Sequence, residues 1–109
     1  MIYQLRVYWA APGKIDNLNA RFRNVTLPLF ARHNMKIIGF WTPEPRTEDS
    51  GDLVYILAFA DQAACDAAWT AFRADPEWQA GKAASEANGP IMTKGTNLMM
   101  NPTDYSPLK

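Results

Sequence analysis

The side chain best placed to bind a charged ligand is Arg6, which lies in the middle of the stretch "IYQLRVYW", between Gln4 and Tyr8. Desolvating an unmatched guanidinium is costly even after the protein relaxes, so a buried arginine needs a partner. Two interpretations follow. Arg6 binds an anionic or carbonyl ligand, or it has a structural role in an ion pair with an acid such as Asp52 or Glu44 or in a hydrogen-bond network.

Two tyrosines, Tyr8 and Tyr55, can add polar tips to an apolar pocket, which is the usual composition of a small-molecule site. With Gln4, Arg6 and Phe40 they form the predicted ligand-binding set. The alternative for both tyrosines is a core position in which a neighbouring group satisfies the hydroxyl, because strand tyrosines often pack in this way.

The only histidine, His33, is the one side chain whose ordinary titration range lies near neutral pH. No serine or cysteine stands at a recognisable nucleophile spacing from it, and Cys65 falls on a helix face that we expect to be buried. We expect His33 to end the first helix, where a cation complements the helix dipole. An acid–base role is the alternative, which makes Arg6, Tyr8 and His33 the catalytic candidates.

The sequence contains no motif that is typical of a metal site or of a common cofactor site. One histidine and one cysteine make no soft-ligand cluster, so we predict no metal site. The sequence also has no glycine-rich phosphate loop and no dinucleotide fingerprint, so we predict no cofactor.

The composition is that of one packed domain spanning residues 1–109, because 48% of the residues are hydrophobic. Eleven basic and eleven acidic side chains balance, which is unlike the basic surplus of nucleic-acid-binding proteins. The N-terminal apolar stretch includes polar and charged residues, and no segment approaches the roughly 18 apolar residues of a membrane span. We therefore expect a soluble cytoplasmic protein with no nucleic-acid partner and no membrane span.

Hydrophobic periodicity divides the chain into elements in the order β-α-β-β-α-β. The pattern predicts strands at 2–9, 36–42, 53–60 and 96–101, and helices over 15–33 and from 62 onward. Asp61 and Asp75 are expected N-caps, with a new short helix starting at Pro76. Asn34 suits a left-handed helix end, and Gly39 suggests a bulge in its strand or a close backbone approach.

This order predicts an α+β fold, the ferredoxin-like βαββαβ plait, in which a four-stranded antiparallel sheet carries both helices on one face. The first strand has one wholly apolar face, which we expect to lie under the helices, and one mixed face that includes Gln4, Arg6 and Tyr8. The same alternation assigns Ile38 and Phe40 to the open face and Trp41 to the helix side.

An open sheet face with apolar residues marks a partner surface. The simplest partner is a second copy related by a two-fold axis, so we predict a homodimer that packs sheet to sheet. The ligand-binding residues would then lie between the two sheets.

Four separated blocks, "MIYQLRVYWAAPGK", "LPLFARHNMKIIGFWT", "ADPEWQA" and "PTDYSPL", resemble the NIPSNAP family in their order and spacing and cover nearly the whole chain. The resemblance implies the dimeric α+β barrel superfamily, in which two ferredoxin-like sheets face each other. It implies no single reaction, since other branches of that superfamily include cofactor-independent monooxygenases and small isomerases.

Three functional hypotheses follow. The first is a NIPSNAP-type homodimeric domain that binds a small, mostly apolar molecule with one polar or anionic end. The second is a cofactor-independent monooxygenase or isomerase in which Tyr8, Arg6 and His33 stabilise an enolate-like anion. The third is a protein-interaction module that uses the short helix around Trp78 and the proline-rich tail.

Overall fold

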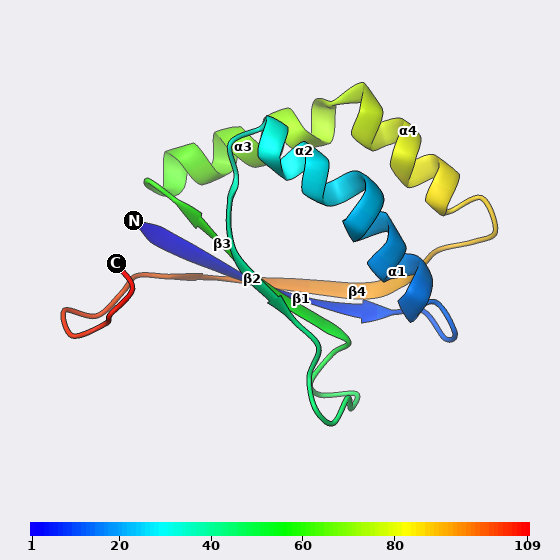
Figure 1. Ribbon diagram of the computed structural model, residues 1–109, viewed down its shortest axis with the longest axis horizontal. Coiled ribbons are helices and arrows are strands. Elements are labelled where there is room, and N and C mark those ends of the chain that lie inside the picture. Colours follow the sequence, from blue (N-terminus) through cyan, green and yellow to red (C-terminus); the bar gives the residue numbers. More distant parts are fainter.

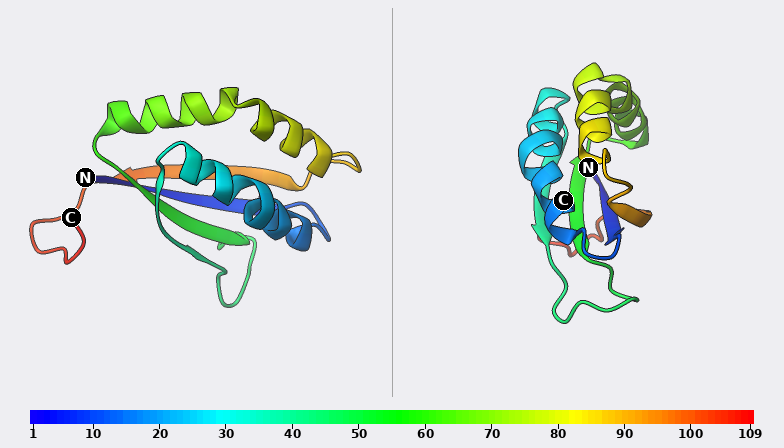
Figure 2. Two further views of the ribbon diagram at one scale, coloured as in Figure 1. Left: turned by 45° about the horizontal axis from the view of Figure 1, so that its top comes forward. Right: turned by 90° about the vertical axis from the view of Figure 1, so that its right-hand side faces the viewer.

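Four antiparallel strands form one sheet in the order β2-β3-β1-β4, and all the helices lie over one of its faces (Figures 1 and 2). The computed structural model describes residues 1–109. The strands are β1 (Ile2–Ala10), β2 (Lys36–Trp41), β3 (Leu53–Phe59) and β4 (Met92–Met100). This is the predicted α+β ferredoxin-like plait.

The first helical segment is continuous but not uniform. It comprises α1 (Ile15–Arg21), a π-helical turn η1 (Phe22–Thr26) and α2 (Leu27–Arg32), where we predicted one helix over 15–33. In a regular α-helix the ring of Pro28 would clash with the carbonyl group of Asn24. The wider π-helical turn contains Asn24, and it therefore accommodates the proline without ending the helix.

The second helical segment is divided into two helices at the position that the sequence predicted. Helix α3 (Gln62–Ala74) begins at Asp61, whose carboxylate accepts a hydrogen bond from the backbone N–H of Ala64 at 2.8 Å. Helix α4 (Pro76–Ser85) begins at Asp75, whose carboxylate accepts from the backbone N–H of Glu77 at 2.9 Å. Both predicted N-caps are confirmed, and Pro76 occupies the first helical turn.

Two backbone predictions are also confirmed, and one boundary is different. Asn34 has a positive φ of 56°, and the β2–β3 register shifts between Ile37 and Gly39, as a bulge requires. Strand β4 begins at Met92 rather than at residue 96. Lysine and glycine in its first half have low strand propensity, but pairing with the end of β1 holds them extended.

The assignment of the two sheet faces was wrong. Gln4 is only 5% exposed and receives a hydrogen bond from Trp69 of α3, so the mixed face of β1 lies under the helices. Phe40 lies on the same side, in edge contact with Phe22, whereas Trp41 is 49% exposed on the open face. The wholly apolar side of β1 therefore belongs to the open face.

The physical reason is that the helices supply partners for the polar groups of the mixed face. The indole of Trp69 satisfies Gln4, and the same ring lies under the guanidinium of Arg6 at 4.2 Å. The core between the layers is largely aromatic, with fully buried Tyr55 in contact with Phe22 and Phe30. No helix of the chain has the length and apolar character needed to cross a lipid bilayer.

Candidate functional site

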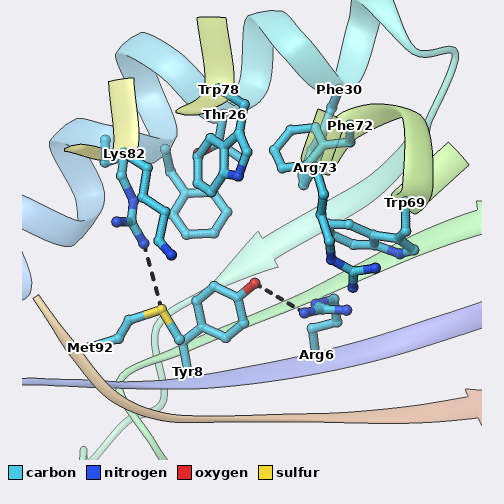
Figure 3. Close-up of a pocket in the computed structure, with 12 residues that line it drawn as sticks. Arg6, Tyr8, Thr26, Phe30, Trp69, Phe72, Arg73, Trp78, Lys82 and Met92 are labelled. Carbon is cyan, nitrogen blue, oxygen red and sulfur yellow. Dashed lines mark hydrogen bonds between the residues drawn. The ribbon is translucent and has the colours of Figure 1, made fainter. Parts of the chain in front are cut away.

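A cavity of about 210 Å³ lies between the helical layer and the sheet (Figure 3). Half of its lining is aromatic: Tyr8, Phe22, Phe30, Trp69, Phe72 and Trp78. The remaining residues include four cations and no carboxylate: Arg6, Arg21, Thr26, Arg73, Lys82 and Met92. An apolar wall with a few polar groups is the composition expected of a small-molecule site, and the charges favour an anion.

A chain of hydrogen bonds presents the hydroxyl of Tyr8 to this cavity. Arg6 Nη2 donates to Tyr8 Oη at 3.3 Å, and Tyr55 Oη donates to the same oxygen at 3.0 Å. Burial raises the pKa of Tyr55 well above its usual value, so Tyr55 keeps its proton. Because Tyr8 Oη accepts twice, its own proton is free for a third partner.

Two arginines share the ring of Trp69 at one end of the cavity. The guanidinium carbon atoms of Arg6 and Arg73 lie 4.2 and 5.3 Å from the ring centroid. Neither forms an ion pair with any carboxylate of the chain. Cation–π contact offsets only part of the charge, so this end of the cavity is left electropositive.

The predicted ion pair of Arg6 with Asp52 or Glu44 is wrong. Asp52 instead accepts a hydrogen bond from the backbone N–H of Ala10 at 2.8 Å and lies 3.9 Å from Arg46. These contacts place the Asp52 carboxylate at the end of β1, in the hairpin region. Arg6 is therefore left with the phenol of Tyr8 and the ring of Trp69 as its partners.

The other predicted binding residues lie near the cavity but do not all line it. Gln4 lines a neighbouring recess on the far side of Arg6 and Trp69. Tyr55 lies behind Tyr8, and Phe40 stacks on Tyr55 with ring centroids 4.9 Å apart. These two rings support Tyr8 from the core.

Two buried polar residues that the sequence did not single out also line the cavity: Arg21 and Thr26. Arg21 and Thr26 are 5% and 3% exposed, and Arg21 Nε and Thr26 Oγ1 have no hydrogen-bond partner. The only signal in the sequence was the presence of a charged and a polar residue within an amphipathic helix. Such residues are equally expected on the solvent-facing side of the helix. Arg6 Nε is the third buried polar atom without a partner.

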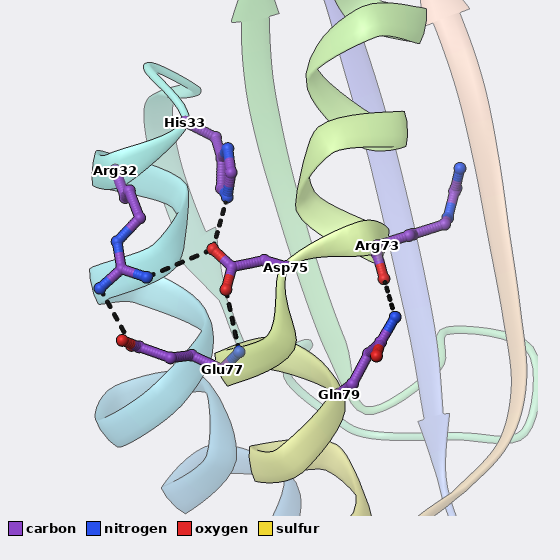
Figure 4. A network of polar contacts seen from close by, with 6 residues as sticks. All are labelled: Arg32, His33, Arg73, Asp75, Glu77 and Gln79. Carbon is purple, nitrogen blue, oxygen red and sulfur yellow. Dashed lines mark hydrogen bonds and ion pairs between the residues drawn. The ribbon is translucent and has the colours of Figure 1, made fainter.

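His33 lies outside the cavity, in a polar network at the junction of α2 and α3 (Figure 4). It follows the last residue of α2, which confirms the predicted helix-end position. Its Nε2 lies 2.8 Å from an oxygen of Asp75, and Arg32 Nη1 lies 3.3 Å from the same oxygen. The contact with His33, followed by the backbone N–H of Glu77, lowers the pKa of Asp75.

This placement separates His33 from the other two catalytic candidates, Arg6 and Tyr8, which do lie together in the cavity. His33 joins the end of one helix to the N-cap of another, which is a structural task. No three side chains of His, Cys, Asp or Glu gather closely enough to hold a metal ion.

Comparison with known proteins gives a consistent result for the family and the fold. The NIPSNAP family model matches residues 3–107. A NIPSNAP family protein from Agrobacterium tumefaciens is similar with a TM-score of 0.85 and 19% identity, over 99% of this chain and 98% of that one. An uncharacterised NIPSNAP domain protein from Burkholderia xenovorans has a TM-score of 0.82 and 20% identity, over 98% and 99%.

An antibiotic biosynthesis monooxygenase is similar in fold to a lesser degree, with a TM-score of 0.64 and 16% identity over 94% of this chain and 99% of that one. The comparison with curated proteins finds no match. The family model covers almost every residue of the sheet, the helices and the tail. The chain therefore belongs to the NIPSNAP family.

Proposed function

We propose that this chain binds a small, mostly apolar molecule with one polar or anionic end, in the cavity between its helices and its sheet. The proposal keeps the ligand class predicted from the sequence but changes the place. The predicted site between two sheets required Gln4, Arg6 and Tyr8 to lie on the open face, and these residues lie under the helices.

The observation that carries the proposal is the combination of a free Tyr8 proton with an unpaired Arg6 charge at an aromatic wall. A protein gains nothing in stability by leaving a buried donor without an acceptor, because each such group retains its desolvation cost. A ligand oxygen placed near Tyr8 Oη and Arg6 Nε would satisfy both donors at once. Phe22, Trp69 and Trp78 would then cover the apolar body of the ligand.

The test is retention and binding of small molecules by purified protein. Native mass spectrometry of the wild-type chain from its source should show a retained mass that Arg6→Met and Tyr8→Phe reduce. The control for loss of an arginine is Arg23→Met, since Arg23 is exposed on η1 and does not line the cavity. Retention that is equal in all four proteins would refute the site.

We also propose that the chain is a single domain that forms a homodimer through the open sheet face. That face has no helical cover (Figure 2). Trp41 is 49% and Leu98 is 57% exposed, and Leu5, Val7 and Ile56 lie only partly buried between them. A stable dimer buries about 800 Å² on each partner, which a four-stranded sheet face can supply.

Light scattering tests the dimer. The wild-type chain should elute with twice its 12.2 kDa mass at micromolar concentration. Leu98→Glu should give monomers, because it places a charge within an apolar interface. Tyr105→Glu, in the exposed tail, should leave the dimer intact. A monomeric wild-type chain would refute the proposal.

A catalytic function is the second candidate, and one observation favours it. Tyr8 Oη receives two hydrogen bonds, one from a guanidinium, and such a polarised hydroxyl stabilises a developing oxyanion. A cofactor-independent monooxygenase or isomerase that passes through an enolate-like anion would use Tyr8 and Arg6 in this way. His33 would take no part, since it lies outside the cavity.

A protein-interaction role through the short helix would need Trp78 at the surface. Trp78 instead lines the cavity and lies 4.7 Å from Phe72, ring centroid to ring centroid (Figure 3). The exposed tail, with Tyr105 and Leu108, is the remaining candidate surface for that hypothesis.

A further inference from the structure

The cavity has a second cationic end, formed by Arg21 of α1 and Lys82 of α4. Arg21 is 5% exposed, which is unusual for a guanidinium. Its Nη1 donates to Ser85 Oγ at 3.3 Å, and its only carboxylate neighbour, Glu86, lies 3.8 Å away at the limit of an ion pair. Lys82 forms no ion pair.

The remaining donors of Arg21 are poorly satisfied. Nε has no partner, and Nη2 reaches only the thioether sulfur of Met92, at 3.6 Å. A thioether is a weak acceptor. The N–H groups of Nε and Nη2 lie side by side on one edge of the guanidinium, where they match the two oxygens of a carboxylate. Burial lowers the pKa of Arg21, as expected for a charge short of partners.

The hydroxyl of Thr26 adds a third donor to the lining. It is buried on the π-helical turn η1, and its Oγ1 has no hydrogen-bond partner. In a regular helix a threonine hydroxyl usually bonds to a carbonyl of the preceding turn. Thr26 Oγ1 and Arg21 Nε therefore both lack a hydrogen-bond partner, and both residues line the same cavity.

This end is separate from the Arg6 end. Arg21 contacts Met92, which pairs with Ala10, whereas Arg6 stands four residues earlier on β1. At about 3.3 Å per residue the two backbone positions are roughly 13 Å apart. Between them lies the ring of Tyr8, whose hydroxyl points to Arg6 and away from Met92 and Lys82 (Figure 3).

We propose that the ligand of this cavity is a diacid: a flat apolar core with a carboxylate at each end, one bound by Arg6 and Tyr8 and the other by Arg21, Lys82 and Thr26. This inference rests on the proposed function and extends it from one anionic end to two. A cavity of about 150 Å³ holds benzene, so a volume of about 210 Å³ suits a core of one aromatic ring that carries the two carboxylates.

The experiment compares terephthalate with benzoate, two probes that share a one-ring core and differ by one carboxylate. Binding is followed by calorimetry and by quenching of tryptophan fluorescence. Wild-type protein should bind the diacid about tenfold more tightly or better, as one charge-assisted hydrogen-bonded contact provides. Arg6→Met should weaken both probes.

The variants of the second end separate the two levels of the proposal. Lys82→Met and Thr26→Val should bring the diacid close to the affinity of the monoacid and leave the monoacid unchanged. Both variants should fold, because Lys82 is exposed and valine is nearly isosteric with threonine. Arg21→Met removes a buried guanidinium, so this variant is used only if it retains the unfolding midpoint of the wild type. Arg23→Met is the control and should change neither affinity.

Equal affinity for the two probes in wild-type protein would overturn the diacid and leave the single-anion site standing if Arg6→Met still weakens binding. An unchanged preference for the diacid in Lys82→Met and Thr26→Val would overturn the second end. No binding of either probe would overturn both proposals.

Discussion

The hydrogen bond between Trp69 and Gln4 gives the sharpest test of which sheet face lies under the helices. Trp69 Nε1 donates to Gln4 Oε1 at 2.6 Å, and the two residues are 6% and 5% exposed. Gln4→Leu removes the acceptor and leaves the indole N–H without one. A buried donor stranded in this way costs about 1–3 kcal/mol of unfolding free energy.

Urea unfolding followed by tryptophan fluorescence measures this cost, at one protein concentration because any dimer would make stability concentration-dependent. The thermal midpoint should fall by about 4–8 °C for each kcal/mol lost in a chain of this size. Gln62→Leu is the matched control, since Gln62 is an exposed glutamine on α3. It should change stability by less than about 0.5 kcal/mol.

A double-mutant cycle isolates the pair. Trp69→Phe removes the indole donor, so adding Gln4→Leu in that background should cost at least about 1 kcal/mol less than it does in the wild type. If Gln4→Leu leaves the midpoint unchanged, or costs the same with and without the indole, then Gln4 does not lie under α3. The placement of Arg6 and Tyr8 on the cavity side would fail with it.

Three further predictions concern other parts of the fold. Gly51→Ala should destabilise the chain more than Gly13→Ala. Both glycines have positive φ, but an added Cβ at Gly51 would lie 2.5 Å from Val7, whereas one at Gly13 meets nothing within 4 Å. Equal unfolding midpoints for the two variants would contradict the packing around Gly51. Burial raises the pKa of the Cys65 thiol, so iodoacetamide at pH 8 should label it slowly in native protein and rapidly in denaturant, and fast native labelling would show that α3 is open. Because the pKa of Asp75 is lowered in the fold, its carboxylate contributes stability above the usual aspartate range, and this contribution is lost as pH falls through the folded pKa. Asp75→Asn should therefore flatten the loss of stability between pH 6 and pH 3. An unchanged slope would show that the His33 contact is not formed.

Much of the architecture followed from local patterns. Alternation over residues 2–9, the apolar spacing over 15–33 and the caps Asp61 and Asp75 predicted the elements, because each depends on neighbours within one or two turns. The start of β4 was missed, since its extended form depends on pairing with β1, more than eighty residues earlier in the chain. The π-helical turn at 22–26 was also missed.

The candidate site was half determined by the sequence. Arg6 and Tyr8 were identified because a guanidinium in mid-strand needs a partner and a tyrosine can add a polar tip to an apolar pocket, and both line the cavity. Arg21 and Thr26 were not identified, because a buried cation and a solvent-facing one look alike in a helical pattern. Their role depends on α4 and β4, which bring Lys82 and Met92 beside them.

The sequence by itself determined the order of strands and helices, the presence of two apolar sheet faces and the residues able to bind an anion. Only the tertiary structure decided which face the helices cover. A strand with one apolar face and one mixed face can turn either one inward, and the choice depends on the partner that each polar group finds. For Gln4 that partner is Trp69, 65 residues away, a distance over which no periodicity in the sequence carries information.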